Sequence, residues 1–289
     1  MTVGIFGNNY QADRQQSIRT LFDGIRRLGG KIYVEPDFSR YLAEHFAYTP
    51  DIDGLIEDDS LSPDIVISLG GDGTFLRTAT WVARRNIPIL GINTGHLGFL
   101  AEIDAGDISE VLDDISKGNY TVEERTLLQL DASLDFHGKY NFALNEVAAL
   151  KRDTSSMISV KTSLNGEYLT TYLADGLVIA TPTGSTAYSM SVNGPIIVPD
   201  ARNFVLSPVA PHSLNVRPLV IPEDYEIRLK VESRSSNFLL ALDGRSKVFP
   251  SGSEFSVKKA DFTVRIIKRL NRTFYGTLRR KLLWGTDTR

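Results

Sequence analysis

The spacing of apolar residues changes near residue 125, and this change constrains the fold more than any other feature of the sequence. In the first part, two short apolar segments, residues 2–7 and 31–34, flank a stretch in which apolar residues recur at helical spacing: Ile18, Leu21, Phe22, Ile25 and Leu28. This order of strand, helix and strand is typical of a βαβ unit with parallel strands.

The same alternation continues along the first part of the chain. Residues 64–69 and 87–93 form apolar segments on either side of a predicted helix over 74–85, and a further helix is marked by Ile108, Val111, Leu112 and Ile115. The acidic stretch 51–64 between these segments is most simply a solvated loop. We therefore expect residues 1–124 to form an α/β domain with a parallel sheet covered by helices, to which the resemblance described below gives the role of binding a nucleotide.

Beyond residue 125 polar and apolar residues alternate, which is the pattern of half-buried strands. Turn signals interrupt this alternation at three dipeptides, His137-Gly138, Asn165-Gly166 and Asp243-Gly244. The pattern predicts a mostly β domain over 125–270, to which the resemblance described below gives the role of binding the dinucleotide. Thr273 is a candidate N-cap for a last helix within 271–289, which we expect to dock its apolar stripe on the first domain.

Composition excludes several classes of function. The net charge is −3 with no long basic stretch, so nucleic acid is not an expected partner, and the absence of cysteine removes disulfides and thiolate chemistry. No apolar stretch approaches the ~20 residues of a membrane span, and the N-terminal residues do not resemble a secretory signal, which favours a cytoplasmic protein. No metal site is expected from the four scattered histidines: His45, His96, His137 and His212.

A glycine-rich turn follows the apolar segment 64–69 and contains a single carboxylate, Asp72, among Gly70, Gly71 and Gly73. Glycine lets a ligand approach the main chain closely, and the N–H groups at the start of the following helix favour a phosphate. The turn is neither a Walker loop nor a complete Rossmann fingerprint. From these residues alone, a phosphate site and a turn in which Asp72 is a local cap are both possible.

Longer motifs favour the phosphate site over the capped turn, because they resemble those of a known family. "GGDGT" at 70–74 is similar to the signature of the superfamily of NAD kinases, diacylglycerol and sphingosine kinases and 6-phosphofructokinases. Further segments resemble the NAD kinase family in order and spacing: "NTGHLGFL" (93–100), "LNEV" (144–147), "ADGLVIATPTGSTAYSMSVNGPI" (174–196) and "PHSL" (211–214).

The resemblance implies an enzyme that transfers a phosphoryl group to the 2′-hydroxyl of the adenosine ribose of NAD, giving NADP. Asp72 would be the general base near that hydroxyl, Gly73 would touch the dinucleotide, and Arg77 would reach a phosphate unless it is simply a solvated helix residue. Because phosphoryl transfer depends on positioning and charge neutralisation, an ordinary aspartate is a sufficient base. Mg²⁺ should arrive with the nucleotide; ATP, another triphosphate and polyphosphate all remain possible donors, and NADH a possible acceptor.

The resemblance also implies dinucleotide contacts in the second domain. Asn145 and Glu146 would bind hydroxyls and the adenine edge, which requires a strand end or a bulge because neighbours in a strand face opposite sides. Asp175 would hold the nicotinamide amide. Pro182, Gly184 and five hydroxyl side chains predict an irregular loop over 181–189. The remaining implied contacts are Thr186, Ala187, Tyr188, Ser189, Met190, Ser191, Ala210 and Arg245.

Three points stay open from the sequence. Tyr188 either stacks on a base or packs in the β domain, and Leu173 and Arg245 depart from the arginine and glutamine found in other members. A lipid kinase would share "GGDGT" but not the Asn-Glu pair, and a dinucleotide-binding sensor would be expected to lose Asp72. The unpaired strand edges expected in a β domain predict a homo-oligomer, either a homodimer or a homotetramer.

Overall fold

The fold is that of a computed structural model, which describes residues 1–9, 15–58, 60–95, 98–132, 136, 140–152, 156–270 and 272–285. The chain divides into two compact units, Met1–Glu124 with Val264–Arg289 and Arg125–Thr263. Two long strands, β7 (Tyr120–Ala132) and β18 (Ser253–Arg269), contribute residues to both units.

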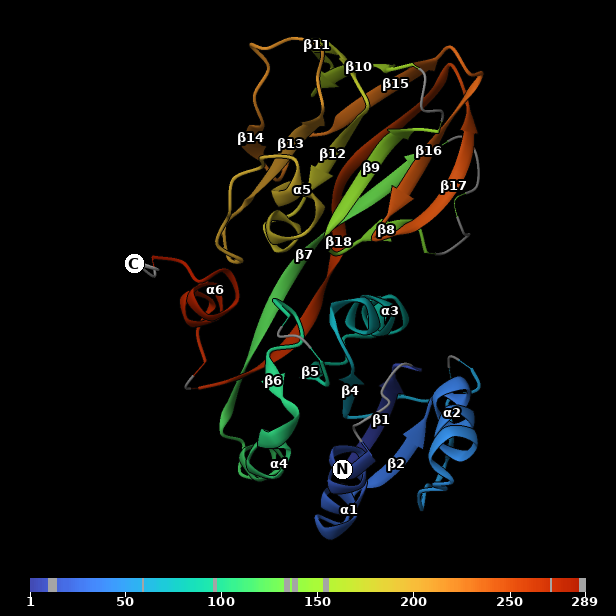
Figure 1. Cartoon of the computed structure of the whole chain (residues 1–289), viewed down its shortest axis with the longest axis vertical. Helices are drawn as coiled ribbons and strands as arrows, with labels where there is room; N and C mark the ends of the chain where they lie inside the picture. Colours follow the sequence, from blue (N-terminus) through green and yellow to red (C-terminus); the bar gives the residue numbers. More distant parts are fainter. Residues whose placement is uncertain are drawn as a thin grey trace. The chain divides into compact units, whose positions relative to one another are not determined.

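The first unit is built on a parallel sheet with the strand order β18-β5-β4-β1-β2-β3 (Figure 1). Each described pair in it is parallel, including Ile266 of β18 opposite Ile89 of β5. Strand β6 (Ile103–Asp104) adds to β5. The other strands are β1 (Thr2–Gly7), β2 (Lys31–Val34), β3 (Gly54–Leu55), β4 (Ile65–Leu69) and β5 (Ile89–Asn93).

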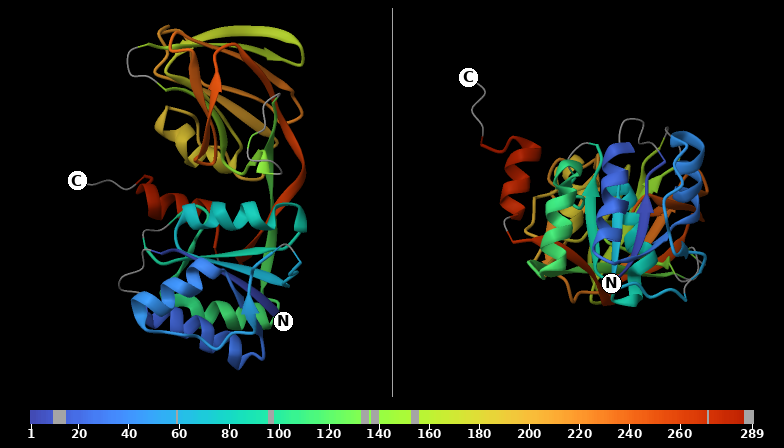
Figure 2. Two further views of the ribbon diagram at one scale, coloured as in Figure 1. Left: turned by 90° about the vertical axis from the view of Figure 1, so that its right-hand side faces the viewer. Right: turned by 90° about the horizontal axis from the view of Figure 1, so that it is seen from below.

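Helices cover both faces of this sheet, as Figure 2 shows, with α3 on one face and α1, α2 and α4 on the other. The predicted apolar stripes of α1 and α4 are buried against the sheet. Leu28 is an exception, since it lies just beyond α1 and is 41% exposed. The helices are α1 (Gln15–Arg27), α2 (Pro36–Phe46), α3 (Asp72–Val82), α4 (Ile108–Ser116) and α6 (Phe274–Leu282).

The second unit contains two antiparallel sheets whose apolar faces share one core. One sheet includes β11-β10-β15-β18, and the other has the order β14-β13-β12-β9-β16-β17. The strands are β8 (Phe142–Ala143), β9 (Glu146–Lys151), β10 (Ile158–Leu164), β11 (Glu167–Ala174), β12 (Gly176–Ala180), β13 (Asn203–Val209), β14 (Leu219–Pro222), β15 (Ile227–Ser233), β16 (Asn237–Leu242) and β17 (Arg245–Pro250). The parallel α/β first domain and the mostly β second domain predicted from the sequence are confirmed.

Two of the predicted hairpins are confirmed. Asn165-Gly166 joins β10 to β11 and Asp243-Gly244 joins β16 to β17, and all four residues have positive φ, as a tight hairpin turn requires. The turn expected at His137-Gly138 lies outside the described residues. On its outer face the six-stranded sheet carries a smaller apolar cluster, against which Tyr188 of the short helix α5 (Tyr188–Ser191) packs.

Several expectations need correction. Helix α3 begins at Asp72 rather than residue 74, because extended Gly71 is its N-cap and Asp72 already has helical backbone. The acidic stretch is not only loop, since it contains β3 and Asp53 accepts the Ile32 N–H. Residues 264–270 belong to the first unit because the end of β18 pairs with β5. Within the described residues no helix is long and apolar enough to cross a membrane.

Candidate functional site

The glycine-rich turn lies where β4 ends and α3 begins, at the carboxyl edge of the parallel sheet. Gly70 is required by packing, because a Cβ there would collide with the Thr74 hydroxyl. A Cβ on Gly71 or Gly73 would meet no heavy atom within 4 Å outside its immediate neighbours. Packing therefore does not explain these two glycines, whereas close approach of a ligand to the backbone would.

Asp72 is tied to the loop that follows β5, not to its own helix. Its Oδ2 accepts the Phe99 N–H at 3.0 Å, and its Oδ1 accepts the N–H groups of Leu100 and Ala101 at 3.0 and 3.1 Å. Gly98 is needed beside it, because a Cβ there would collide with the carboxylate. A carboxylate offers about four lone-pair sites. Three N–H groups orient Asp72 and leave Oδ2 able to accept a further hydrogen bond.

The C-terminal helix α6 brings a cation to Asp72. The Thr273 hydroxyl accepts the Gly276 N–H at 3.1 Å, so the predicted N-cap is confirmed. Phe274 lies 6.3 Å from Phe99 between ring centroids. About two turns further along α6, the Lys281 Nζ lies 3.7 Å from Asp72 Oδ2 and 4.5 Å from the centre of the Phe99 ring. The Asp72 side chain stays 32% exposed. Sequence reasoning missed Lys281, whose only signal was its place in the basic end of a docking helix.

Arg77 is neither simply solvated nor free. Its Nη2 donates to the Gly7 carbonyl at 2.6 Å and to Glu35 at 3.0 Å. Burial raises the pKa of Glu35, and Arg77 acts in the opposite direction. Almost half of the Arg77 side chain is exposed, so part of a guanidinium held at the end of β1 remains available to an anion.

In the second unit, Asn145 and Glu146 lie at the start of β9, the strand end that a shared ligand-facing role requires. Two neighbouring segments hold their backbone. Asp243 accepts the N–H groups of Leu144, Asn145 and Glu146 at 2.7, 2.8 and 3.1 Å. On the other side Thr181 donates its N–H to the Asn145 carbonyl at 2.9 Å.

Glu146 has an unusual environment. Its Oε2 is buried and has no hydrogen-bond partner among the described residues, and its carboxyl receives the backbone N–H of Tyr188. Burial first, and the charge of Asp243 second, raise the pKa of Glu146 to about 8. Burial raises the pKa of the Tyr188 hydroxyl as well, with smaller contributions from Glu146 and Asp175.

The hydroxyl-rich stretch is more regular than the sequence predicted, since it forms a 3₁₀ helix over Thr183–Thr186 followed by α5. The structure assigns several hydroxyls to internal bonds. Ser189 is fully buried and bonds to Ser207 at 3.0 Å, and the Thr181 hydroxyl donates to the Leu144 carbonyl. Thr186, Ala187, Tyr188 and Met190 are half-buried, and Ser191 is exposed.

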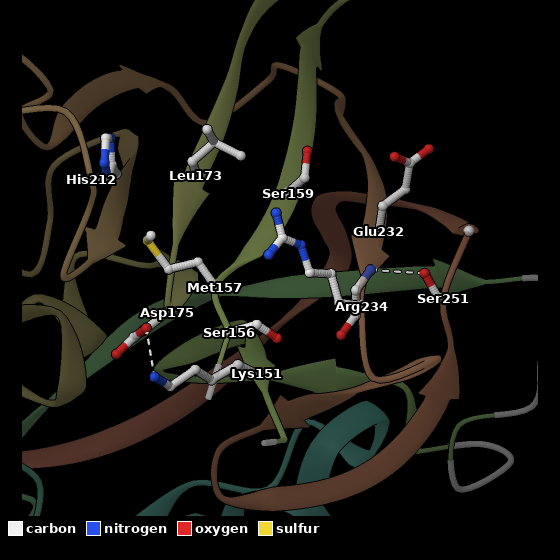
Figure 3. Close-up of a pocket in the computed structure, with 12 residues that line it drawn as sticks. Lys151, Ser156, Met157, Ser159, Leu173, Asp175, His212, Glu232, Arg234 and Ser251 are labelled. Atoms are coloured by element: carbon white, nitrogen blue, oxygen red, sulfur yellow. Dashed lines mark hydrogen bonds and ion pairs between the residues drawn. The ribbon is translucent and has the colours of Figure 1, made fainter. Parts of the chain in front are cut away.

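Asp175 lines a cavity of about 840 Å³ in the second unit (Figure 3). Lys151 Nζ pairs with its carboxylate at 2.7 Å. Leu173 and His212 line the same cavity, and the His212 N–H donates to the Leu173 carbonyl at 2.8 Å. The departure at Leu173 therefore gives this cavity an apolar wall where an arginine would supply a charge.

The last two implied residues have other roles in the fold. Ala210 is exposed and has a positive φ of 42° at the end of β13. Arg245 donates from Nη1 to the Tyr140 carbonyl at 2.7 Å and from Nη2 to the Phe142 carbonyl. Its guanidinium thus supports the segment before Asn145 rather than pointing at a free site. Asp243 was missed as a site residue, because the sequence marked it only as a turn.

No group of three or more His, Asp or Glu side chains in the described part of the chain is arranged to hold a metal ion. His96 and His137 lie outside that part. Asp72, Gly73 and Arg77 are near one another in the first unit. In the second unit Asn145, Glu146 and Tyr188 form one cluster, and Asp175 lies at the cavity of Figure 3.

Comparison with known proteins identifies the family. Residues 3–120 match the ATP-NAD kinase N-terminal domain and residues 144–269 match the ATP-NAD kinase C-terminal domain. The chain is 50% identical to an NAD kinase of Bacteroides fragilis over 289 residues, covering all of both chains. It is 47% identical to an NAD kinase of Porphyromonas gingivalis over 287 residues, covering 99% of each. The chain therefore belongs to the ATP-NAD kinase family.

Solved structures share the fold. Yeast NADH kinase complexed with NADH superposes with a TM-score of 0.88 at 22% identity, covering all of this chain and 89% of that one. An NAD kinase from Archaeoglobus fulgidus in complex with ATP gives a TM-score of 0.75 at 24% identity, covering 96% and 99%. The two-domain arrangement of elements predicted from the motifs is thus that of the family.

Proposed function

We propose that this chain transfers the terminal phosphoryl group of ATP to the 2′-hydroxyl of the adenosine ribose of NAD, giving NADP, with Asp72 as general base. ATP-dependent phosphorylation of NAD is the activity of the family to which the chain belongs. The observation that carries the assignment of Asp72 is its oriented, partly exposed carboxylate, which keeps room at Oδ2.

The reaction needs an oriented hydroxyl and neutralised phosphate charge more than a strong base. Asp72 would accept the ribose proton as the new P–O bond forms and the bond to the leaving ADP breaks. Lys281 beside it, the open backbone at Gly71 and Gly73, and the exposed part of Arg77 would offset phosphate charge.

The second unit would hold the dinucleotide. Buried Asn145 and half-buried Glu146 and Tyr188 form a polar cluster suited to a base and its ribose. Tyr188 would be the stacking ring, surrounded by Thr186, Ala187, Met190 and Ser191. Asp175, exposed by about a third at the cavity, would accept hydrogen bonds from the nicotinamide amide. Ser189 would act indirectly by fixing α5, Ala210 by its small size, and Arg245 through its carbonyl contacts.

The donor set fits Mg²⁺ bound by the nucleotide phosphates rather than by a protein cage, since the described residues form no acidic cluster. Mg²⁺ would neutralise phosphate charge during transfer. The direct test incubates pure protein with NAD, Mg²⁺ and ATP, another triphosphate or polyphosphate, and detects NADP with an NADP-specific dehydrogenase. No NADP with any donor would contradict the proposal. NADH in place of NAD tests the second acceptor.

The NAD kinase relatives favour the enzyme over the non-catalytic sensor considered from the sequence, and the same assay separates the two, since a sensor binds NAD but forms no NADP. The oriented Asp72 favours the enzyme. The cytoplasmic location stays a prediction from the sequence.

We also propose a homo-oligomer, a homodimer or homotetramer, formed mainly by second units. Strand β11 is at one end of its sheet and exposes Tyr168 and Leu173 by more than half, and Leu214 of the same unit is 86% exposed. Open edges and exposed apolar side chains favour pairing. A fully active monomer in sedimentation at assay concentration would rule this out, and loss of association in Leu173→Glu would support it.

A further inference from the structure

Two acidic residues of the second unit, Glu146 and Asp243, act on each other electrostatically. Asp243 is a half-buried residue of the turn between β16 and β17, its carboxyl group is buried, and both of its oxygens accept backbone N–H groups from residues 144–146. In return the Asp243 N–H donates to the Glu146 carbonyl at 3.2 Å. The Asp243 carboxylate and the Glu146 backbone are therefore fixed relative to each other by a closed set of hydrogen bonds.

Asp243 has more hydrogen-bond donors around its carboxyl group than Glu146 has. Asp243 has three N–H donors and the nearby Arg245 guanidinium, all of which favour its ionised form. Glu146 has the Tyr188 N–H and a buried Oε2 without a partner among the described residues. Burial raises the pKa of Asp243 as well, and its donors offset only part of that effect. Because Asp243 has three N–H donors and Glu146 has one, we assign a single proton in the pair to Glu146.

Among the described residues, the other charged or titratable groups near Glu146 do not supply a compensating cation. Tyr188 is neutral and Asp175, which acts on Tyr188, is negative and paired with Lys151. Arg245 is directed at the carbonyls of Tyr140 and Phe142. An ionised Glu146 would therefore sit beside Asp243 with one N–H donor.

We propose that Glu146 meets the dinucleotide as a neutral carboxylic acid whose O–H donates a hydrogen bond to a lone pair of the bound nucleoside, and that Asp243 is the positioning residue that keeps it neutral. This deepens the proposed function and rests on it for the identity of the ligand. In the ligand-free structure Oε2 is buried without a partner among the described residues, so the Glu146 side chain must turn for its O–H to reach a ring nitrogen or a ribose oxygen of the nucleoside. Asp243 touches no ligand and acts through the charge and backbone of its neighbour.

The first test is the dissociation constant of NAD without phosphoryl donor, measured calorimetrically between about pH 6 and about pH 9.5. We expect constant affinity at low pH and a roughly tenfold loss per pH unit once Glu146 ionises near pH 8. Glu146→Gln keeps a donor that does not titrate, so its affinity should be independent of pH. Flat affinity in the parent would overturn the proposal.

Asp243→Asn separates positioning from simple support. The asparagine oxygen can still accept the N–H groups of Asn145 and Glu146, whereas its NH₂ takes the place of the oxygen that accepts from Leu144. The side chain carries no charge, so Glu146 should ionise at lower pH. We expect weaker NAD binding than the parent at about pH 7.5 and recovery toward parental affinity at about pH 5.5. A loss that is equal at all pH values would indicate a merely structural Asp243. The matched control is Asp53→Asn, which removes a carboxylate that accepts the Ile32 N–H in the first unit and should leave the profile unchanged.

A second measurement does not depend on NAD. Carboxyl ¹³C NMR of the ligand-free protein, with Glu146 identified by its absence in Glu146→Gln, should show a titration near pH 8 in the parent. A midpoint near 4.5 would refute the inference even if NAD binds or if Asp243→Asn does not fold. A midpoint near 8 without NAD binding at any pH would uphold the neutral acid, refute its role toward a dinucleotide and count against the proposed function.

Discussion

Asp72 in the first unit and Asp243 in the second are held by the same device. Each accepts the N–H groups of three consecutive residues, 99–101 for Asp72 and 144–146 for Asp243, at 2.7 to 3.1 Å. They differ in exposure and in their charged neighbour. The Asp72 side chain is a third exposed and lies beside Lys281, whereas the Asp243 residue is half-buried but its carboxyl group is buried and acts on Glu146.

Because of this difference, Asp72 can react with a substrate, whereas Asp243 can only influence the groups around it. A partly exposed carboxylate can be reached by a substrate and can take a proton from it. A buried carboxylate saturated by N–H groups can only act on what surrounds it. The three N–H bonds therefore give each aspartate its orientation, and the environment determines its chemistry.

The largest expected effect comes from removing the reactive acid. Asp72→Asn should lower kcat by about 10²- to 10⁴-fold while NAD still binds, because asparagine cannot accept the ribose proton. The amide NH₂ must also face at least one of the three N–H groups now held by the carboxylate. Calorimetric NAD binding is therefore needed beside the kinetics. Turnover within about threefold of the parent would make Asp72 a structural cap.

Replacement by alanine should lower the free energy of unfolding more at Asp243 than at Asp72, although we expect Asp72 to be the more important residue for activity. Asp243→Ala leaves three buried N–H groups unsatisfied and should lower the free energy of unfolding by at least ~3 kcal/mol, at about 1–3 kcal/mol for each group. Asp72→Ala should cost less, about 1–2 kcal/mol, because water can reach the exposed position. Urea denaturation measures both. Equal losses would show that exposure does not distinguish the two sites.

The neutral acid beside Asp243 should also appear in the pH dependence of stability. The pKa of Glu146 is raised by folding from 4.5 to about 8, so the folded chain keeps a proton that the unfolded chain releases. The parent's free energy of unfolding must therefore fall relative to Glu146→Gln as pH rises through this interval, by more than ~1 kcal/mol. Denaturation at about pH 5 and about pH 8 measures it. Glu167→Gln, an exposed change on β11, is the control and should show no such trend.

The smallest effect is expected at Lys281, the neighbour that distinguishes Asp72. Lys281→Met should lower kcat by about 3- to 10-fold with little change in the NAD affinity, because its charge acts across a partly exposed 3.7 Å separation. Lys281→Arg should restore most of the activity. Arg279→Met removes an exposed charge from the same helix and serves as the control. Equal effects of Lys281→Met and Arg279→Met on kcat would show that Lys281 has no specific role beside Asp72.

Local patterns predicted much of this molecule. The spacing of apolar residues predicted α1 and α4, and the dipeptide Asn165-Gly166 predicted a hairpin, because these features depend on residues that are close in the chain. The cradles of Asp72 and Asp243 could not be predicted, since their partners lie 27 to 29 and 97 to 99 residues away. Helix α2 was also missed, although Pro36 marks its first turn. Motif resemblance pointed to Asp72 and Glu146, but the protonation of Glu146 depends on burial that the sequence does not display.

The order in which the two units can fold during synthesis follows from the return of β18 to the first sheet. Residues 125–263 form one uninterrupted segment and can fold as they emerge from the ribosome. The first unit cannot be completed so early, because β5 awaits Ile266 and Asp72 awaits Lys281, both made after the whole second unit. A growing chain can thus acquire the proposed dinucleotide-binding cluster of the second unit before the charged surroundings of Asp72 are finished. We therefore expect a nascent chain to reach its full rate of phosphoryl transfer only after helix α6 has been translated.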